Sequence, residues 1–410
     1  MSETQQTAST NMAAQPAQSI ANYARAYVVR MKSGDLGSLP IIFGMIVIAI
    51  IFQSANENFL TPRNFVNLIV QMAGITTIAI GVVFVLLLGE IDLSIGYVSA
   101  VAAVFMALRL RPPEPWPWYA AVIVALAAVS VIGVIQGAII TKFRLPSFVV
   151  TLAGLLVWNG VVLLLIGAAG TVIIQDDIIV GIANTFLPPQ IGWAVGAVVV
   201  AFFAIGRAWR WRSRRKRGVS TTPPIVLFVQ IAAVAAIIGA VVYICNADRG
   251  VPLVGVILVI LLAAFSFLAA RTGFGRYVYA VGGNIEAARR AGISVDRVRV
   301  TVFMISSLMA GMGGLILASR LRSVDTAAGG GNLLLISIAA PVIGGTSLFG
   351  GRGRVMSALL GALVIASVEN GMGLLGLSAG VKFVVTGLVL LAAVLVDAIT
   401  RRGRTEAGTG

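Results

Sequence analysis

The feature that most constrains this chain is a series of long apolar segments that recurs from residue 39 almost to the C-terminus. A helix needs about 20 apolar residues to cross the roughly 30 Å hydrocarbon layer of a membrane. Segment 225–245 is the clearest, with no charged residue and a single Gln, Gln230. Segments 190–206 and 333–349 are short and glycine-rich, so we expect one or both of them to be half-helices. The apolar segments are 39–55, 65–88, 91–108, 118–140, 147–167, 190–206, 225–245, 252–270, 300–319, 333–349, 355–376 and 381–399.

These segments predict an all-α polytopic membrane protein with about 10–12 transmembrane helices, some of them broken or half helices. A membrane β-barrel would show alternating segments of about ten residues, whereas these segments are longer and apolar on all sides. Charged residues make up 11% of the chain and hydrophobic residues 59%. Soluble domains carry about 25% charged residues, so the composition argues strongly against a soluble enzyme.

The chain contains no His and a single Cys, Cys245. A framework of disulfides within the chain is therefore excluded. Catalytic triads, metal sites and proton relays that depend on His are excluded as well. We expect no catalytic residues, no metal site and no cofactor in this chain.

The Lys and Arg residues are unevenly placed along the chain, which has a net charge of +15. With a cytoplasmic N-terminus, 23 of the 30 cations fall in tails and loops of the cytoplasmic side, which is the positive-inside pattern. We expect a transmembrane domain over 39–400 between flexible cytoplasmic tails, 1–38 and 401–410. The positive net charge then requires no nucleic-acid partner. The basic loop 207–217 either orients the protein in the membrane or also binds anionic membrane lipid.

The loop 271–299 contains a predicted helix of about two turns over 285–291. A favourable N-cap precedes it, a C-cap glycine follows it, and its charges complement the helix dipole. A small-faced helix of this kind fits the cleft of a partner protein, but a helix that only connects two spans has the same pattern. The residues of this candidate are Asn284, Glu286, Ala287, Ala288, Arg289, Arg290 and Gly292.

The segment 279–293, YAVGGNIEAARRAGI, resembles the coupling motif of binding-protein-dependent ABC importers, in the form found in monosaccharide permeases. Three further segments resemble the same family in the same order. They are NFLTPRNFVNLI at 58–69, GEIDLSIG at 89–96 and PVIGGTSLFGGRGR at 341–354. The resemblance extends over roughly 40–400.

This resemblance implies a transport subunit, and not an enzyme, in the bacterial inner membrane, where it moves a monosaccharide by alternating access. The implied partners are a cytoplasmic ATP-binding subunit that hydrolyses the ATP, a periplasmic sugar-binding protein and a second permease copy. Glu90 stands where the shorter ribose-type members usually carry Gly, and the chain has extra segments around 170–245. Both features look like the longer xylose-type permease, so we expect a pentose such as xylose.

Polar groups next to or within the apolar segments are candidates for the translocation path. Glu90 and Asp92 are carboxylates close to the hydrocarbon, where placing a charged group costs free energy. Asp92 also fits a helix cap, and Glu90 fits a contact with a hydroxylated solute or with an Arg. Polar pairs inside spans suit sugar recognition as well as helix–helix hydrogen bonding. These pairs are Trp158–Asn159 and Glu369–Asn370.

Two other functions are weighed against the importer. An ion-coupled secondary transporter would use Glu369, or Glu90 and Asp92, as its coupling groups. A membrane-embedded transferase would need clustered acids for a metal, and the single adjacent pair of acids is Asp176–Asp177. The glycine-rich segment 344–353 lacks the Gly-Lys-Ser/Thr ending of a phosphate loop, so no nucleotide site is expected.

Overall fold

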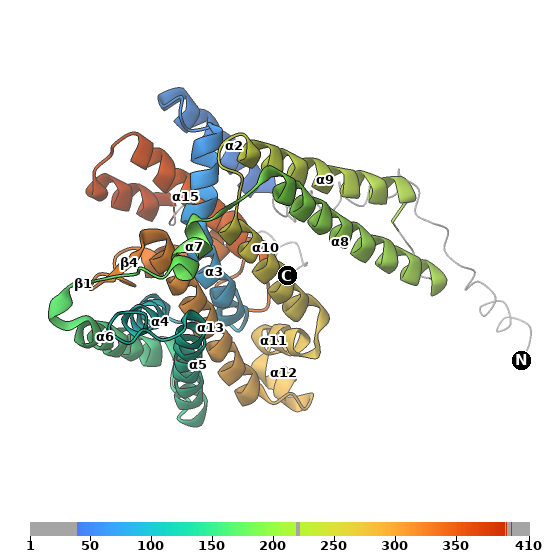
Figure 1. Cartoon of the computed structure of the whole chain (residues 1–410). Coiled ribbons are helices and arrows are strands. Elements are labelled where there is room, and N and C mark those ends of the chain that lie inside the picture. Colours follow the sequence, from blue (N-terminus) through green and yellow to red (C-terminus); the bar gives the residue numbers. More distant parts are fainter. Residues whose placement is uncertain (1–38, 219–221, 390, 392–394, 396–410) are drawn as a thin grey trace, which may run out of the picture. The chain divides into compact units, whose positions relative to one another are not determined.

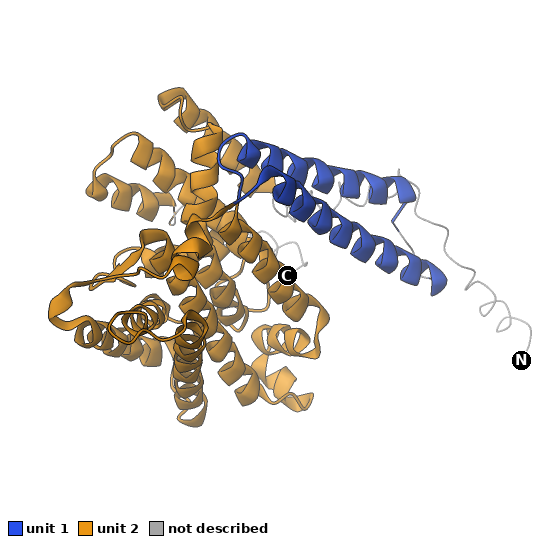
Figure 2. Ribbon diagram, in the orientation of Figure 1, with its two compact units in different colours: residues 1–36, 187–251, 400–410 blue, residues 37–186, 252–399 orange. Residues whose placement is uncertain are grey.

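The computed structural model describes residues 39–218 and 222–389, together with 391 and 395. The two tails expected from the sequence lie outside the described residues. The chain divides into two compact units (Figure 2). Besides tail residues, unit 1 consists of 187–251, and unit 2 consists of 37–186 and 252–399.

Unit 2 is a bundle of helices with a few very short strands (Figure 1). Its first part contains α2 (Leu39–Ala55), α3 (Pro62–Leu87), α4 (Ile95–Arg109), α5 (Trp118–Lys142), α6 (Ser147–Ile166), the 3₁₀ turn η1 (Gly167–Ala169), β1 (Thr171–Ile173) and α7 (Asp177–Asn184). Its second part contains α10 (Leu253–Arg271), α11 (Gly273–Gly283), α12 (Ile285–Arg290), α13 (Val295–Leu321), β4 (Ser323–Asp325), α14 (Leu333–Ile343) and α15 (Met356–Leu374). Unit 1 contains α8 (Pro189–Lys216) and α9 (Pro224–Asn246), and the strands β2 (Phe186–Leu187) and β3 (Val251–Pro252) lie where the two units join in sequence.

As far as the described residues extend, each predicted apolar segment coincides with a helix, which confirms the all-α polytopic class. Within the described residues, 8 helices are long and apolar enough to cross a membrane. The apolar helices shorter than these are Leu39–Ala55, Ile95–Arg109, Leu333–Ile343 and Ala379–Val389.

The two segments expected to be half-helices behave differently. Helix α14 has 11 residues and contains Pro341, so it extends about 16 Å and is too short to cross the hydrocarbon. The segment 190–206 is not a half-helix, because it belongs to α8, a single helix of 28 residues that continues to Lys216. Most of the basic segment 207–217 is therefore helical and not a loop, since Arg, Lys and Trp residues extend the helix beyond the apolar run.

Helix α13 occupies the centre of unit 2 and packs against α3, α4 and α5. Glycines permit this close packing: a Cβ atom at Gly137 of α5 would lie 2.8 Å from the Cα atom of Val300. The most apolar windows of α3 and α13 are 78% and 67% buried, whereas that of α6 is only 17% buried. Since an apolar helix exposed in this way is stable in lipid, α6 has the character of a lipid-facing span.

Unit 1 is a pair of packed helices, α8 and α9. Gly196 of α8 allows the approach of Val242, whose Cγ2 atom would lie 3.0 Å from a Cβ atom at Gly196. Gln230 is the polar residue noted inside the apolar run of α9, and its Oε1 atom accepts a hydrogen bond from Arg207 of α8. Because an unpaired amide in hydrocarbon is costly, this bond accounts for a Gln within a span.

Segments that the charge pattern assigns to the same side of the membrane lie together in unit 2. On the side expected to be periplasmic, β1 pairs with β4 in an antiparallel register that places Val172 opposite Val324. On the side expected to be cytoplasmic, the amide of Gly351 donates to the carbonyl of Leu87 at 2.8 Å. The fold is thus consistent with the expected order of inner and outer loops, and which side is cytoplasmic stays a prediction from the charges.

Candidate coupling site

The short helix predicted in the loop 271–299 is present as α12, and hydrogen bonds close both of its ends. The Oδ1 atom of Asn284 accepts the amide of Ala287 at 2.9 Å, as a favourable N-cap does. The amides of Gly292 and Ile293 donate to the carbonyls of Arg289 and Ala288. Gly292 has a φ of +81°, so the helix ends in a Schellman motif. The predicted cap residues are therefore confirmed.

Helix α12 lies at the edge of unit 2 (Figure 1), and most of its residues are exposed. Glu286 and Arg289 form an exposed ion pair with an N–O distance of 2.9 Å. Ala288 differs from its neighbours because it is only 4% exposed and packs into the main hydrophobic cluster. This residue therefore holds the helix on the protein, whereas the partner-facing candidates are exposed. The exposed residues of α12 are Ile285, Glu286, Ala287, Arg289 and Arg290.

A surface groove lies beside α12, between α11 and the start of α13. It presents the exposed cation Arg297 next to Tyr277, which is 48% exposed. The lining residues are Phe274, Tyr277, Gly292, Ile293, Ser294, Arg297, Val298 and Thr301. Helix α12 and this groove together form a surface that is rich in cations and carries an exposed aromatic ring.

The end of α11, directly before α12, touches two other loops backbone to backbone. A Cβ atom at Gly282 would overlap the carbonyl of Leu87 at the end of α3. A Cβ atom at Gly350, whose φ is +85°, would lie 2.8 Å from the carbonyl oxygen of Gly282. Only glycine allows these approaches. We call this contact of Leu87, Gly282, Gly350 and Gly351 the glycine junction.

Glu90, two residues before Asp92 in the turn between α3 and α4, pairs with Arg299 in the second turn of α13. The Oε1 atom of Glu90 accepts a hydrogen bond from the Nε atom of Arg299. Glu90 is 9% exposed, and within the described residues its Oε2 atom is buried without a hydrogen-bond partner. Burial raises the pKa of the Glu90 carboxyl group, while the hydrogen bond and charge of Arg299 act in the opposite direction. Of the two partners considered for Glu90, the structure shows the Arg.

Asp92 lies in the same turn and is hydrogen-bonded to Ser94, directly before α4, and to Ser306 of α13. Its Oδ1 atom accepts the amide and the hydroxyl of Ser94, and its Oδ2 atom accepts the hydroxyl of Ser306 on α13 at 3.0 Å. Ser94 in turn contacts Gln136 of α5 at 3.1 Å. The expected helix cap is not formed, because Asp92 binds the amide of Ser94, one residue before α4, and no amide inside the helix.

The polar pairs inside the spans lie in different surroundings. Asn370 is 8% exposed, and it accepts a hydrogen bond from Asn64 at 2.7 Å. This contact between α15 and α3 is the helix–helix role weighed for Asn370. Trp158 is partly buried, and its Nε1 atom has no hydrogen-bond partner within the described residues. Asn159 and Glu369 are partly buried as well.

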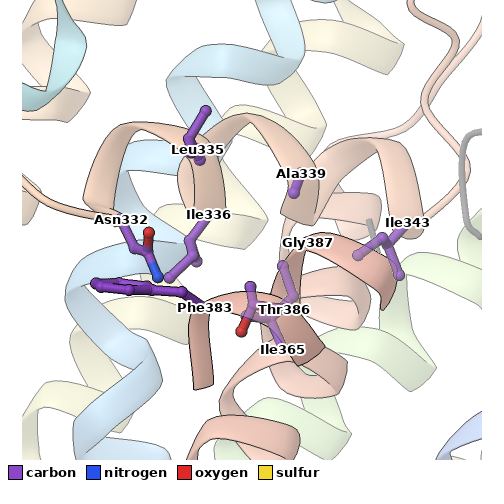
Figure 3. A pocket seen from close by; sticks show the side chains of 9 residues that line it. All are labelled: Asn332, Leu335, Ile336, Ala339, Ile343, Ile365, Phe383, Thr386 and Gly387. Atoms are coloured by element: carbon purple, nitrogen blue, oxygen red, sulfur yellow. The ribbon is translucent and has the colours of Figure 1, made fainter. Parts of the chain in front are cut away.

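A pocket in the same unit lies between α14, α15 and the helix Ala379–Val389 (Figure 3). Its lining is mostly apolar, with Asn332 and Thr386 as polar members. None of the six path candidates lines this pocket, as far as the described residues show. The lining residues are Asn332, Leu335, Ile336, Ala339, Ile343, Ile365, Phe383, Thr386 and Gly387.

Arg299 and the glycine junction are not among the candidate residues that the sequence predicted. Arg299 counted only as one of the orienting cations, although an Arg at the edge of the apolar run 300–319 is itself a sign of a buried acidic partner. The glycines belong to two of the recognised motifs, but their contacts join segments far apart in sequence. Such contacts are decided by the tertiary structure.

Comparison with known proteins gives the family. Residues 64–394 match the family described as the permease component of the branched-chain amino acid transport system. The xylose transport system permease protein XylH of Escherichia coli (strain K12) is 36% identical over 386 residues, which cover 91% of this chain and 94% of that protein. XylH of Haemophilus influenzae is 33% identical and covers 91% of this chain and 99% of its own length.

The ribose import permease protein RbsC of Bacillus subtilis is 32% identical over 365 residues, which cover 89% of this chain and 94% of that protein. No solved structure matches the chain. The family match, the relatives and the bundle of apolar helices agree with each other. The chain therefore belongs to this permease family and is a multi-pass transport subunit of the ABC-importer type.

Proposed function

We propose that this protein imports a pentose, with xylose as the leading substrate, by alternating access in the bacterial inner membrane. The relatives that support this choice are the xylose and ribose permeases. Glu90 and the additional helices α8 and α9 are the features that we associate with the xylose type. Both termini are proposed to be cytoplasmic because most of the Lys and Arg residues fall on the side of the termini.

The observation that carries the coupling mechanism is the capped, outward-facing helix α12, which is followed directly by the central helix α13. We propose that a separate ATP-binding subunit grips α12 and the groove beside it, and that ATP binding and hydrolysis in that subunit move α12. Asn284 and Gly292 define the ends of α12, and Ala288 anchors it. Glu286, Ala287, Arg289 and Arg290 are exposed for contact.

The remaining partners follow from the importer type. A periplasmic sugar-binding protein delivers the sugar, and two permease copies line one path. Trp158, Asn159 and Glu369 stay candidates for that path, whereas Glu90, Asp92 and Asn370 are engaged by other side chains of the permease. The arginines at the end of α8 suit contact with anionic lipid headgroups. The relatives give no support to an ion-coupled secondary transporter.

The test is transport by the purified complex in liposomes. The permease, its ATP-binding subunit and its sugar-binding protein are reconstituted, and uptake of labelled xylose is measured with and without ATP. We expect uptake that depends on ATP and on the ATP-binding subunit, and that excess unlabelled xylose reduces more strongly than ribose does. Uptake by the permease alone, driven by an ion gradient, would contradict the proposal. Stronger competition by ribose than by xylose would identify ribose as the preferred substrate.

A further inference from the structure

Both flanks of α12 are attached to one short segment of the permease. On the N-terminal flank, Gly282 touches the carbonyl of Leu87 in the glycine junction. On the C-terminal flank, Arg299 binds Glu90. Leu87 and Glu90 are three residues apart in the chain, so a helix that a partner pushes is held at both ends by the same segment, 87–94.

The segment 87–94 contacts α13 a second time, and it also contacts two further helices, α5 and α6. The hydroxyl of Ser306 on α13 donates to Asp92. Gln136 of α5 contacts Ser94 at 3.1 Å, and the hydroxyl of Ser147, the first residue of α6, accepts the amide of Ile91 at 3.3 Å. The segment thus contacts α5, α6 and α13 through buried or partly buried hydrogen bonds.

These attachments differ in kind from the ordinary packing of the bundle. The glycine junction is a contact between backbones, which have no side-chain rotamers to absorb a displacement. The ion pair is largely removed from water, with side-chain exposures of 19% for Arg299 and 10% for Glu90. A buried ion pair adds little net stability compared with apolar residues of the same size, so its presence at this position calls for a role besides stability.

We propose that the segment 87–94 receives the movement of α12, and that Glu90 and Arg299 are positioning residues for energy coupling. The ion pair ties α13 to the turn that leads into α4, so that α12, α13 and α4 move as one body when the ATP-binding subunit moves α12. This inference rests on the proposed function for the existence of that subunit, and it adds the route by which the movement enters the membrane domain. Glu90 acts here through Arg299 and makes no contact with sugar.

The experiment measures sugar uptake per ATP hydrolysed in the reconstituted complex, using the monosaccharide that the wild-type complex imports. The variants are Glu90→Gln, Arg299→Met and the double variant. We expect all three to assemble with the ATP-binding subunit and to hydrolyse ATP, while uptake per ATP falls by at least about fivefold. Arg299→Lys retains the charge and should largely restore coupling.

The double variant separates coupling from charge neutralisation. A single change leaves one buried charge without its partner and can destabilise the protein, whereas removing both charges together is often neutral for stability. If the pair only neutralises two buried charges, the double variant will couple as well as the wild type, and the proposal is wrong. If the pair connects moving elements, the double variant stays uncoupled although it folds.

The matched control is Ser319→Ala at the other end of α13. The hydroxyl of Ser319 is buried, accepts the amide of Ala183 at 2.9 Å and donates to the carbonyl of Val180 on α7. Its loss removes buried hydrogen bonds of the same helix without touching the segment 87–94. Normal coupling in this control and reduced coupling in the double variant would support the proposal, and equal losses in both would refute it. If the wild-type complex imports a sugar other than a pentose, only the proposed substrate is contradicted, and the proposed coupling route is not.

Discussion

A change at the N-cap of α12 directly tests the proposed role of this helix in coupling. In Asn284→Ala the helix loses the hydrogen bond from the amide of Ala287 to the Oδ1 atom of Asn284, which is 2.9 Å long. Loss of an N-cap of this type costs about 1 kcal/mol. Because Asn284 is exposed and α12 has only 6 residues, that cost falls on the helix itself and leaves the bundle intact.

A cost of about 1 kcal/mol reduces the population of the folded helix relative to its frayed forms by about fivefold. Two measurements report this change. Hydrogen exchange at the amides of Ala287 and Ala288 should become faster by about that factor, and the affinity for the ATP-binding subunit should fall by a similar factor. The thermal unfolding of the whole permease in detergent should stay nearly unchanged.

Two further variants make this prediction sharp. Asn284→Ser keeps a favourable cap and should retain most of the affinity. Asp176→Ala removes a cap of the same kind from α7, where the Oδ1 atom of Asp176 accepts the amide of Ile179 at 2.9 Å. This second change should leave the affinity untouched. If Asn284→Ala accelerates exchange in α12 but leaves assembly and uptake normal, α12 only connects two spans and our reasoning about it is refuted.

The remaining predictions concern packing and the path candidates. Gly137→Ala should lower the stability of the permease in detergent by about 1–3 kcal/mol, because its Cβ atom would lie 2.8 Å from the Cα atom of Val300. Gly160→Ala, which meets nothing within 4 Å, should be neutral, and equal melting temperatures in both variants would contradict the packing argument. Asn370→Ala should cost about 1–3 kcal/mol by removing the acceptor of one of the two hydrogen bonds of the Asn64 amide group, with uptake per folded complex near normal. A large loss of uptake at unchanged stability would instead place Asn370 in the sugar path.

The sequence predicted the positions of the helices well because each depends on a local property. An apolar run of sufficient length forms a helix in lipid whatever its neighbours are, and caps such as Asn284 and Gly292 act within a few residues. The error at α8 has a local origin as well. The apolar run ends at 206, whereas the basic residues that follow it extend the helix to Lys216.

The candidate site shows where such reasoning stops. The sequence alone identified α12, its caps and the exceptional position of Glu90 between two apolar runs. It left open whether Glu90 meets a solute or an Arg, because the answer is Arg299, which lies 209 residues away in the chain. It also placed Ala288 among the residues available to a partner, whereas the packing of α12 turns this side chain into the core.

The sequence by itself determined the membrane class, the apolar helices, the capped helix α12 and the family. Hydrophobicity, helix capping and short motifs are local properties that can be read from neighbouring residues. Only the tertiary structure decided that Leu87 meets Gly282 and that Glu90 meets Arg299, because these contacts depend on how α3, α11 and α13 pack against one another. The attachment of α12, the proposed coupling helix, to the rest of unit 2 is a property of that packing.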